Sequence, residues 1–267
     1  MDVCTITQDA FFVASPHEVF EIFTDARAHT AMSGGERAEI DARVGGRVWA
    51  FEGAVTAVFR EIADGRRIVQ IWRDCDWPEG HFAQLELQFV AVNEGRGTHV
   101  RMTLSGVPAG EARQTANGWR DFYWVPIAEY LRDAKVRPAR RFLLEFKNRA
   151  NLDAVDETWA EDSTLHLGRL ELAPARQPQK SVGRTIFRAF DDVRVEVEDR
   201  IVEGDRVVER HRATGVHAGE FLGIPPTGRR VSWTGNHIYR IADGRIAEAW
   251  PEVSLYELLT QLTEVSH

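Results

Sequence analysis

The stretch His-Ile-Tyr-Arg-Ile-Ala-Asp-Gly-Arg-Ile-Ala-Glu-Ala-Trp at residues 237–250 predicts a β-hairpin. Its Asp243-Gly244 pair is a strong signal for a two-residue turn between two strands. The cross-strand partners expected across this turn are Ile241 with Ile246, Tyr239 with Glu248, and His237 with Trp250. The same strand parity places Glu248 or Glu252 diagonal to His237, so an imidazole and a carboxylate could meet beside an indole.

This hairpin face has two interpretations. If it lines a cavity, His237 could act as a general base with Glu252 as its orienting partner. If the face points outward, or if His237 is a structural histidine with satisfied hydrogen bonds, it carries no chemistry. A β-bulge would also reverse the parity of one strand.

The residues around the hairpin predict an α+β domain in the second half of the chain. Helices are expected at about 140–162 and 179–190, and strands at about 193–203, 205–217, 229–242 and 245–253. The polar segment 136–141 contains Pro138. We expect it to be a linker between a first domain, residues 1–135, and a second domain, residues 142–267.

The first half also predicts a complete α+β domain. Ser15-Pro16-His17-Glu18 is a capping box that opens a helix. Alternating apolar and polar runs between about 39 and 107 predict antiparallel strands. A long helix is expected at about 110–134, and Pro126 should kink it.

Composition excludes several classes of function. The 267 residues carry a formal net charge of −8, spread over both halves, so neither half offers the positive field that attracts nucleic acid. No apolar run approaches the ~20 residues that a membrane helix requires, so no membrane partner is expected. Two cysteines and the absence of a signal peptide at Met1–Thr5 predict a cytoplasmic location.

Residues 8–135 resemble a known family in several segments taken in order. These include Met32-Ser33-Gly34-Gly35, Arg43-Val44-Gly45-Gly46, Trp77-Pro78-Glu79-Gly80-His81 and Gly118-Trp119-Arg120-Asp121-Phe122-Tyr123-Trp124. They are similar to the START-like (SRPBCC) superfamily, in the branch named after the activator of heat-shock-protein ATPase. The resemblance implies a helix-grip fold, in which a curved sheet wraps a long helix around an apolar cavity. Candidate residues of the cavity wall are Trp49, Phe51 and Trp119.

Residues 140–267 resemble a second family. The segments that carry this are Gly215-Val216-His217-Ala218-Gly219-Glu220-Phe221, Pro225-Pro226-Thr227-Gly228-Arg229-Arg230-Val231 and the hairpin itself. They are similar to the SnoaL-like polyketide cyclases of the nuclear-transport-factor-two-like superfamily. The resemblance implies a cone-shaped α+β barrel with a ligand pocket, a homodimer formed through the sheet, and ring closure by intramolecular aldol addition without a cofactor.

The family places its acid–base aspartate just after a tryptophan, and here this chain departs from the pattern. The corresponding run is Trp250-Pro251-Glu252-Val253-Ser254, in which only Glu252 is acidic. The candidate catalytic residues are therefore His237 and Glu252.

Further side chains are candidates for substrate binding. His166 and His217 stand where the family often has histidine, and Trp233, Tyr239 and Trp250 share the hairpin face or its neighbourhood. Arg210 and His211 lie on opposite faces of one strand, so at most one enters the pocket. We favour Arg210, which matches the family's usual arginine and could bind an enolate or a carboxylate.

No metal site is expected. His166, His211, His217 and His237 with Glu252 would be enough ligands, but none has the short spacing of a metal motif. Cys75 lies between Asp74 and Asp76, whose charges disfavour its thiolate, so it is not expected to be a nucleophile.

The sequence thus predicts a cofactor-independent cyclase or isomerase that acts on a small, apolar or aromatic, polyketide-like molecule in the C-terminal cavity. One alternative is a non-catalytic small-molecule-binding or stress-response accessory protein. A third hypothesis is a co-chaperone of a heat-shock ATPase.

Overall fold

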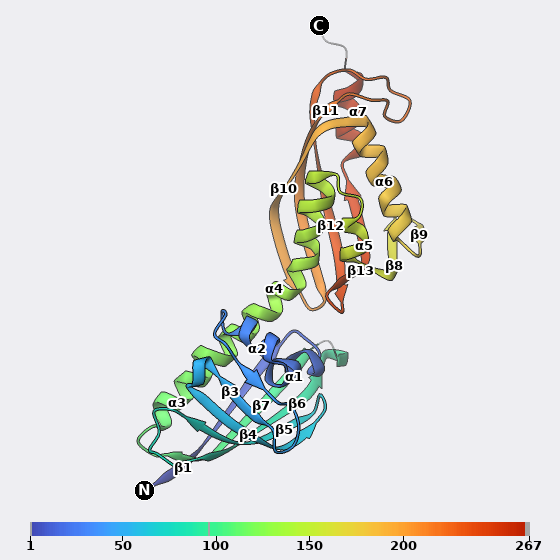
Figure 1. Cartoon of the computed structure of the whole chain (residues 1–267). Coiled ribbons are helices and arrows are strands. Elements are labelled where there is room, and N and C mark those ends of the chain that lie inside the picture. Colours follow the sequence, from blue (N-terminus) through green and yellow to red (C-terminus); the bar gives the residue numbers. More distant parts are fainter. Residues whose placement is uncertain (1, 96, 265–267) are drawn as a thin grey trace. The chain divides into compact units, whose positions relative to one another are not determined.

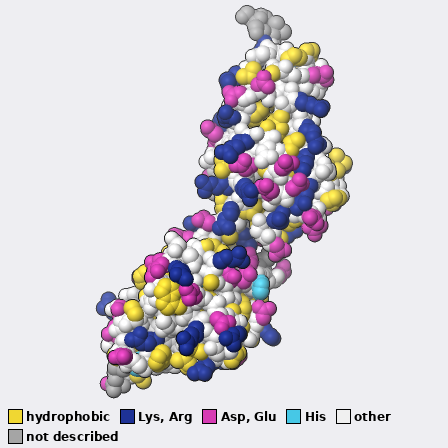
Figure 2. Space-filling model, viewed as in Figure 1, with side chains coloured by type: hydrophobic (Ala, Val, Ile, Leu, Met, Phe, Trp, Pro, Cys, Tyr) yellow, Lys and Arg dark blue, Asp and Glu magenta, His cyan; other side chains and the backbone are white. Residues whose placement is uncertain are grey.

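The computed structural model describes residues 2–95 and 97–264 of the chain. The chain divides between Asp133 and Ala134 into two compact units, each of which combines helices with one β-sheet (Figure 1). The α+β class predicted from the sequence is confirmed. On the face shown in Figure 2, basic and acidic side chains are interspersed over each unit.

The first unit is built on a seven-stranded antiparallel sheet with the order β1-β7-β6-β5-β4-β3-β2. Its strands are β1 (Val3–Phe12), β2 (Glu39–Ile40), β3 (Arg47–Ala50), β4 (Val55–Ala63), β5 (Arg67–Asp74), β6 (Ala83–Val92) and β7 (Gly97–Pro108). Two short helices, α1 (Pro16–Thr24) and α2 (Ala26–Met32), connect β1 to β2. The capping box is confirmed, because the Glu18 backbone N–H donates to Ser15 Oγ while the Ser15 backbone N–H donates to the Glu18 carboxylate.

The helix after β7 runs through three types of helical turn. It begins as α3 (Ala112–Gly118), widens into a π-helix at Trp119–Trp124, and continues as α4 (Val125–Arg141). Its fully buried side chains, Trp119 and Ile127, pack against the sheet in the helix-grip arrangement. The segment 136–141 that the sequence predicted to be a linker is helical and belongs to α4, with Pro138 inside the helix.

The second unit is built on a six-stranded sheet with the order β10-β11-β12-β13-β8-β9. Its strands are β8 (Trp159–Leu167), β9 (Leu170–Leu172), β10 (Phe190–Glu203), β11 (Arg206–His217), β12 (Arg230–Ala242) and β13 (Arg245–Val253). Only the β13–β8 pair is parallel among these. The sheet ends at β10 on one side and β9 on the other, so it is open at both edges.

Helical segments cover one face of this sheet (Figure 1). They are a π-helix at Phe142–Lys147, α5 (Ala154–Thr158), α6 (Arg176–Ala189) and α7 (Leu255–Thr263). The expected helix over 140–162 is wrong beyond Thr158, because the chain becomes extended at Trp159 and β8 pairs with β13. Apolar side chains between the helices and the sheet form two separate clusters, one around Phe142, Trp159 and Tyr239 and one around Phe190, Trp233 and Leu258.

Candidate functional site

The hairpin of β12 and β13 has a different register from the one that the sequence predicted. Ile241 pairs with Ile246 as expected, but a β-bulge lies between Arg240 and Ile241. Beyond this bulge His237 pairs with Pro251, and Trp250 pairs with Ile238. The predicted constellation of His237, Trp250 and Glu252 is therefore wrong, because directly paired residues share a face and neighbours along a strand do not.

Trp250 and Glu248 lie on the outer face of the hairpin, where both contact His166 of β8. The His166 ring stacks on the Trp250 indole with centroids 4.6 Å apart and an interplanar angle of 4°. The Glu248 carboxylate lies 3.2 Å from His166 Nε2 and 2.6 Å from Arg240 Nε. Glu252 is exposed and lines a shallow surface hollow together with Arg210.

Arg210 also lies on the outer face, so the preference for Arg210 over His211 as the inward residue is wrong. Arg210 pairs with Glu198 at 2.6 Å and is 52% exposed. His211 is 4% exposed and faces the helices. Alternation along β11 fixes this choice, because Val207 and Ala213 are buried on the same face as His211.

The inner face of β11 and β12 brings two histidines together. The rings of His211 and His237 stack with centroids 4.5 Å apart and an interplanar angle of 14°. Gly235 pairs with His211, and the absence of a side chain at Gly235 leaves the room that the His211 ring occupies. The sequence indicated His237 as an inward candidate, whereas His211 as its inward neighbour was missed.

Lys147 completes this cluster from the last residue of the π-helix. Its Nζ lies 2.7 Å from His237 Nδ1 and 3.3 Å from the Tyr239 hydroxyl. π-Helical turns are rare and are frequent at functional sites. Sequence reasoning did not find Lys147, although one available signal was that lysine occurs at only three positions against 30 arginines.

Burial and charge shift the ionisation of these groups. Burial lowers the pKa of Lys147 to about 8, although the nearby Glu209 carboxylate acts in the opposite direction. Burial and the Lys147 charge lower the pKa of His211 to about 3, and they hold the pKa of His237 well below its ordinary value. Burial and Glu209 raise the pKa of Tyr239 well above its ordinary value, so its phenol stays protonated. We refer to Lys147, His211, His237 and Tyr239 as the inner cluster.

A buried ion pair lies next to the inner cluster. Glu209 is 1% exposed, and its Oε1 accepts hydrogen bonds from Arg200 Nε at 3.0 Å and Nη2 at 2.7 Å. Because both bonds come from one guanidinium, Arg200 neutralises the carboxylate at close range.

His217 and Trp233 lie in the other apolar cluster. His217 is fully buried, and its Nδ1 accepts a hydrogen bond from the Thr227 backbone N–H at 3.2 Å. Both rings contact Phe190, with centroids 5.3 Å away in each case. This environment is apolar and separate from the Lys147 amine.

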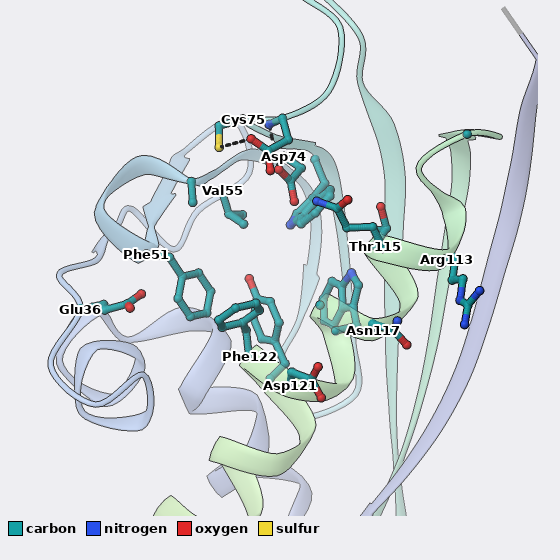
Figure 3. Close-up of a pocket in the computed structure, with 18 residues that line it drawn as sticks. Glu36, Phe51, Val55, Asp74, Cys75, Arg113, Thr115, Asn117, Asp121 and Phe122 are labelled. Atoms are coloured by element: carbon teal, nitrogen blue, oxygen red, sulfur yellow. Dashed lines mark hydrogen bonds between the residues drawn. The ribbon is translucent and has the colours of Figure 1, made fainter.

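The first unit contains a cavity of about 790 Å³ between the sheet and the helix that begins with α3. Its aromatic wall consists of Phe51, Trp72, Trp119, Phe122 and Tyr123. Figure 3 shows Phe51 and Phe122 on one side of the open space, and Asp74 and Thr115 on the other side. Phe51 and Trp119, predicted as wall residues, therefore line the same cavity.

Trp49 does not line this cavity. It lies in a second hollow with Ile71 and Phe82. The prediction of Trp49 as a residue of this cavity wall together with Phe51 is wrong, because β3 ends at Ala50 and Phe51 has a φ of 52°. The left-handed backbone at Phe51 breaks the strand parity.

Asp74, Cys75 and Asp76 form a group at the rim of the first cavity that could hold a metal ion. Their ligand atoms lie within 4.8 Å of one another. Burial and the two aspartates raise the pKa of the Cys75 thiol, which disfavours the thiolate that a metal would need.

The inner cluster is poorly suited to a metal ion. The Lys147 ammonium lies 2.7 Å from His237 Nδ1 and occupies the lone pair that a metal would use.

The protein is a two-domain α+β protein. Its first domain has a helix-grip fold with a cavity, and its second domain has an open sheet covered by helices. Residues 13–132 match the family described as Activator of Hsp90 ATPase homolog 1-like protein, and residues 137–262 match the SnoaL-like polyketide cyclase family. The chain therefore carries a domain of each family, in that order.

Individual proteins are similar to each domain. The human Activator of 90 kDa heat shock protein ATPase homolog 1 is 33% identical over 126 residues, which cover 47% of this chain and 36% of the relative. A solved Hsp90 activator from Plasmodium falciparum is 29% identical over 48% of this chain and 95% of its own, with a TM-score of 0.45. IdmH from Streptomyces antibioticus, provisionally described as a polyketide cyclase, is 29% identical over 49% of this chain and 99% of its own, with a TM-score of 0.44.

The SnoaL-like domain supports a cyclase-type role, and the chain spans about a third of the length of the human relative of its first domain. Within the described residues, no helix is both long enough and apolar enough to cross a membrane.

Proposed function

We propose that the C-terminal domain is a cofactor-independent enzyme of cyclase or isomerase type. It would remove a proton next to a carbonyl group of a small, largely apolar oxygenated molecule. The observation that carries this proposal is the 2.7 Å contact between Lys147 Nζ and His237 Nδ1 in the buried inner cluster. The reaction needs a base with a pKa near the working pH and a hydrogen-bond donor at the oxygen where charge develops.

In this proposal Lys147 and His237 handle the proton as a pair. With a pKa of about 8, Lys147 is present in both protonation states near neutral pH, so it can take up a proton and return it. His237 stays neutral and accepts a hydrogen from the amine at Nδ1, which fixes the direction of the amine. Glu252, which lies outside the inner cluster, has no part.

Tyr239 is the proposed donor to the developing enolate. Its hydroxyl lies 3.3 Å from Lys147 Nζ, and its raised pKa keeps the phenol protonated while the substrate oxygen gains charge. The Phe142 ring lies against the inner cluster on the helical side, with its centroid 5.7 Å from Lys147 Nζ and 6.3 Å from the Tyr239 ring, and Phe146 stacks on it. This lining favours an apolar substrate with few polar groups.

Proton transfer gives a role to Lys147, whose charge is not required to stabilise the fold. A buried ammonium costs stability unless a partner compensates for its lost hydration. Lys147 is not required to neutralise Glu209, because Arg200 already donates two hydrogen bonds to that carboxylate. An apolar residue at this position would satisfy packing alone.

The test is solvent deuterium uptake into small ketones. The full chain is incubated in deuterated buffer with cyclic and aryl ketones, and exchange next to the carbonyl is followed by NMR. We expect Lys147→Met and His237→Gln each to slow the catalysed exchange by at least about 100-fold, the lower end of what an acid–base group contributes. His166→Gln, on the outer face, is the matched control and should retain the rate. Equal rates in all four proteins would contradict the proposal.

A non-catalytic role of the first domain is the second candidate, and the 790 Å³ cavity favours it. Its wall of Trp72, Trp119 and Tyr123 suits an apolar or aromatic ligand. Native mass spectrometry of the protein purified from its own host should show a bound small molecule that is lost in Trp119→Ala. Retention of the ligand in that variant would place it elsewhere.

A protein partner of the first domain is a third candidate, because its human relative is named as an activator of a heat-shock ATPase. The relative is matched over only 36% of its length, so the match does not cover the larger part of that protein. Addition of this chain to an Hsp90-type ATPase from the same host should raise ATP turnover if the role is shared.

A further inference from the structure

Lysine is scarce in this chain, and its three positions have different surroundings. Lys180 Nζ forms an ion pair with Asp156 at 2.6 Å. Lys135 is 7% exposed and lies in α4. Lys147 instead faces an imidazole and a phenol, and no carboxylate of the described residues lies within ion-pair distance of it. Residue 147 as a whole is half-buried.

We propose that Lys147 is a nucleophile that forms an imine with the carbonyl group of a small ketone or aldehyde. The inference rests on the same site as the proposed function and deepens it, because it names a carbonyl compound as the substrate class. It adds a covalent step that simple proton transfer does not require.

The surrounding groups fit the chemistry of imine formation. The neutral amine of Lys147 attacks the carbonyl carbon, and the carbonyl π electrons move to the oxygen. The amine then loses one proton to His237 Nδ1, the atom 2.7 Å away, and the oxygen gains a proton from the Tyr239 hydroxyl. A second proton, returned by His237, lets the hydroxyl leave as water while the nitrogen lone pair forms the C=N bond. Loss of water leaves the protonated imine, and Tyr239 regains its proton from solvent. In sum, the Lys147 amine, one carbonyl compound and one proton yield one iminium and one water.

The charges around Lys147 favour a reactive amine. Burial lowers its pKa to about 8, so a substantial fraction is neutral at a pH where an ordinary lysine is fully protonated. The titratable groups that face it are His211 and His237 from β11 and β12, Tyr239 from β12 and Glu209 from β11. Both histidines stay neutral and the phenol stays protonated over this range, while Glu209 is paired with Arg200. The fraction of neutral amine at Lys147 therefore depends on the protonation of Lys147 itself and not on that of its neighbours.

The experiment is labelling with 2,4-pentanedione, a small diketone that condenses with a reactive lysine to a stable enaminone. The full chain is treated at a series of pH values, digested, and mapped by mass spectrometry at its three lysines. We expect one adduct per chain, at Lys147, with a labelling rate that rises with pH to a midpoint near 8. Lys147→Met should lose the adduct, whereas Lys180→Arg, which keeps a cation beside Asp156, should retain it.

Trapping with borohydride separates this inference from the proposed function. A simple ketone plus borohydride should leave a reduced adduct on Lys147. Proton exchange without any trapped adduct would overturn the imine and leave proton transfer intact. A trapped adduct without exchange would overturn proton transfer and leave the imine. Labelling spread evenly over Lys135, Lys147 and Lys180, or a midpoint above pH 10, would also overturn the inference, and the wild-type map does not depend on any variant folding.

Discussion

The imidazole of His211 lies parallel to that of His237, with ring centroids 4.5 Å apart. This stacking depends on Gly235, which is the cross-strand partner of His211. A Cβ atom at Gly235 would lie 2.7 Å from His211 Cε1 and 2.7 Å from the backbone oxygen of Glu252. The stacking of the two imidazoles thus requires a residue without a side chain at position 235.

Gly235→Ala should therefore disturb the inner cluster. The backbone oxygen of Glu252 cannot move away cheaply, so the new methyl group should displace His211 and lower the free energy of unfolding by about 1–3 kcal/mol. Denaturant unfolding measures the loss. Gly215→Ala on the inner face of β11 is the control, because its nearest contacts are 3.3 Å away and the loss should be smaller. Equal losses would show that the His211 contact has no special cost.

Acid should destabilise the second domain through its neutral histidines. Burial and the Lys147 charge hold the pKa of His211 at about 3, below its ordinary value of 6.5. Below pH 6.5 the unfolded chain binds a proton that the folded chain does not, so stability falls as pH falls, by up to about 1.4 kcal/mol per pH unit for one such group. His211→Phe keeps an aromatic ring for stacking and should reduce the slope of stability between pH 6.5 and 5.

His29 in the first domain acts in the same direction as His211, so the His211 contribution is the difference in slope between the variant and the wild type. Burial also lowers the pKa of His29. A His29→Phe variant should leave the His211 contribution unchanged, since the two side chains belong to different units. An unchanged slope in His211→Phe would contradict the neutral state of His211.

Alkaline conditions should have the opposite effect through Lys147. Its pKa of about 8 in the folded chain lies below the ordinary 10.5, so between these values the unfolded chain binds more protons. Stability should rise with pH across this window, by up to about 3 kcal/mol. Lys147→Met should be more stable than wild type at pH 7.5 and should lack the rise. Denaturant unfolding at pH 7.5 and pH 10 makes this comparison, and a rise of equal size in the variant would assign it to another group.

Local signals in the sequence predicted much of the fold because they act over a few residues. The Ser15 capping box and the Ile241–Ile246 pair both form as predicted. The family resemblances are also confirmed, over residues 13–132 and 137–262. These features depend on turns and on the order of motifs, and both can be read from one amino-acid sequence.

The candidate site could be predicted only in part, because it depends on register and on contacts distant in sequence. One extra residue of β13, Ala247, lies opposite the step from Arg240 to Ile241 and moves Trp250 and Glu252 to the face opposite His237. No local signal reveals the bulge. Lys147 meets His237 across 90 residues of sequence, so periodicity within either segment cannot show their contact. Strand parity predicts correctly that Arg210 and His211 lie on opposite faces of β11. Parity alone does not say which of these faces points toward the helices.

Arg200→Met should destabilise the second domain far more than the similar change at Arg210. Arg200 donates both of its hydrogen bonds to Glu209, which is 1% exposed, so its removal leaves a buried carboxylate without its cation. Breaking such a pair typically costs about 3–5 kcal/mol. Arg210 pairs with Glu198 on the outer face and is 52% exposed, so Arg210→Met should cost less than about 1 kcal/mol. Adding Glu209→Leu to Arg200→Met removes the unpaired charge and should recover most of the loss in denaturant unfolding; if it recovers none, packing by Arg200 and not its charge stabilises the site.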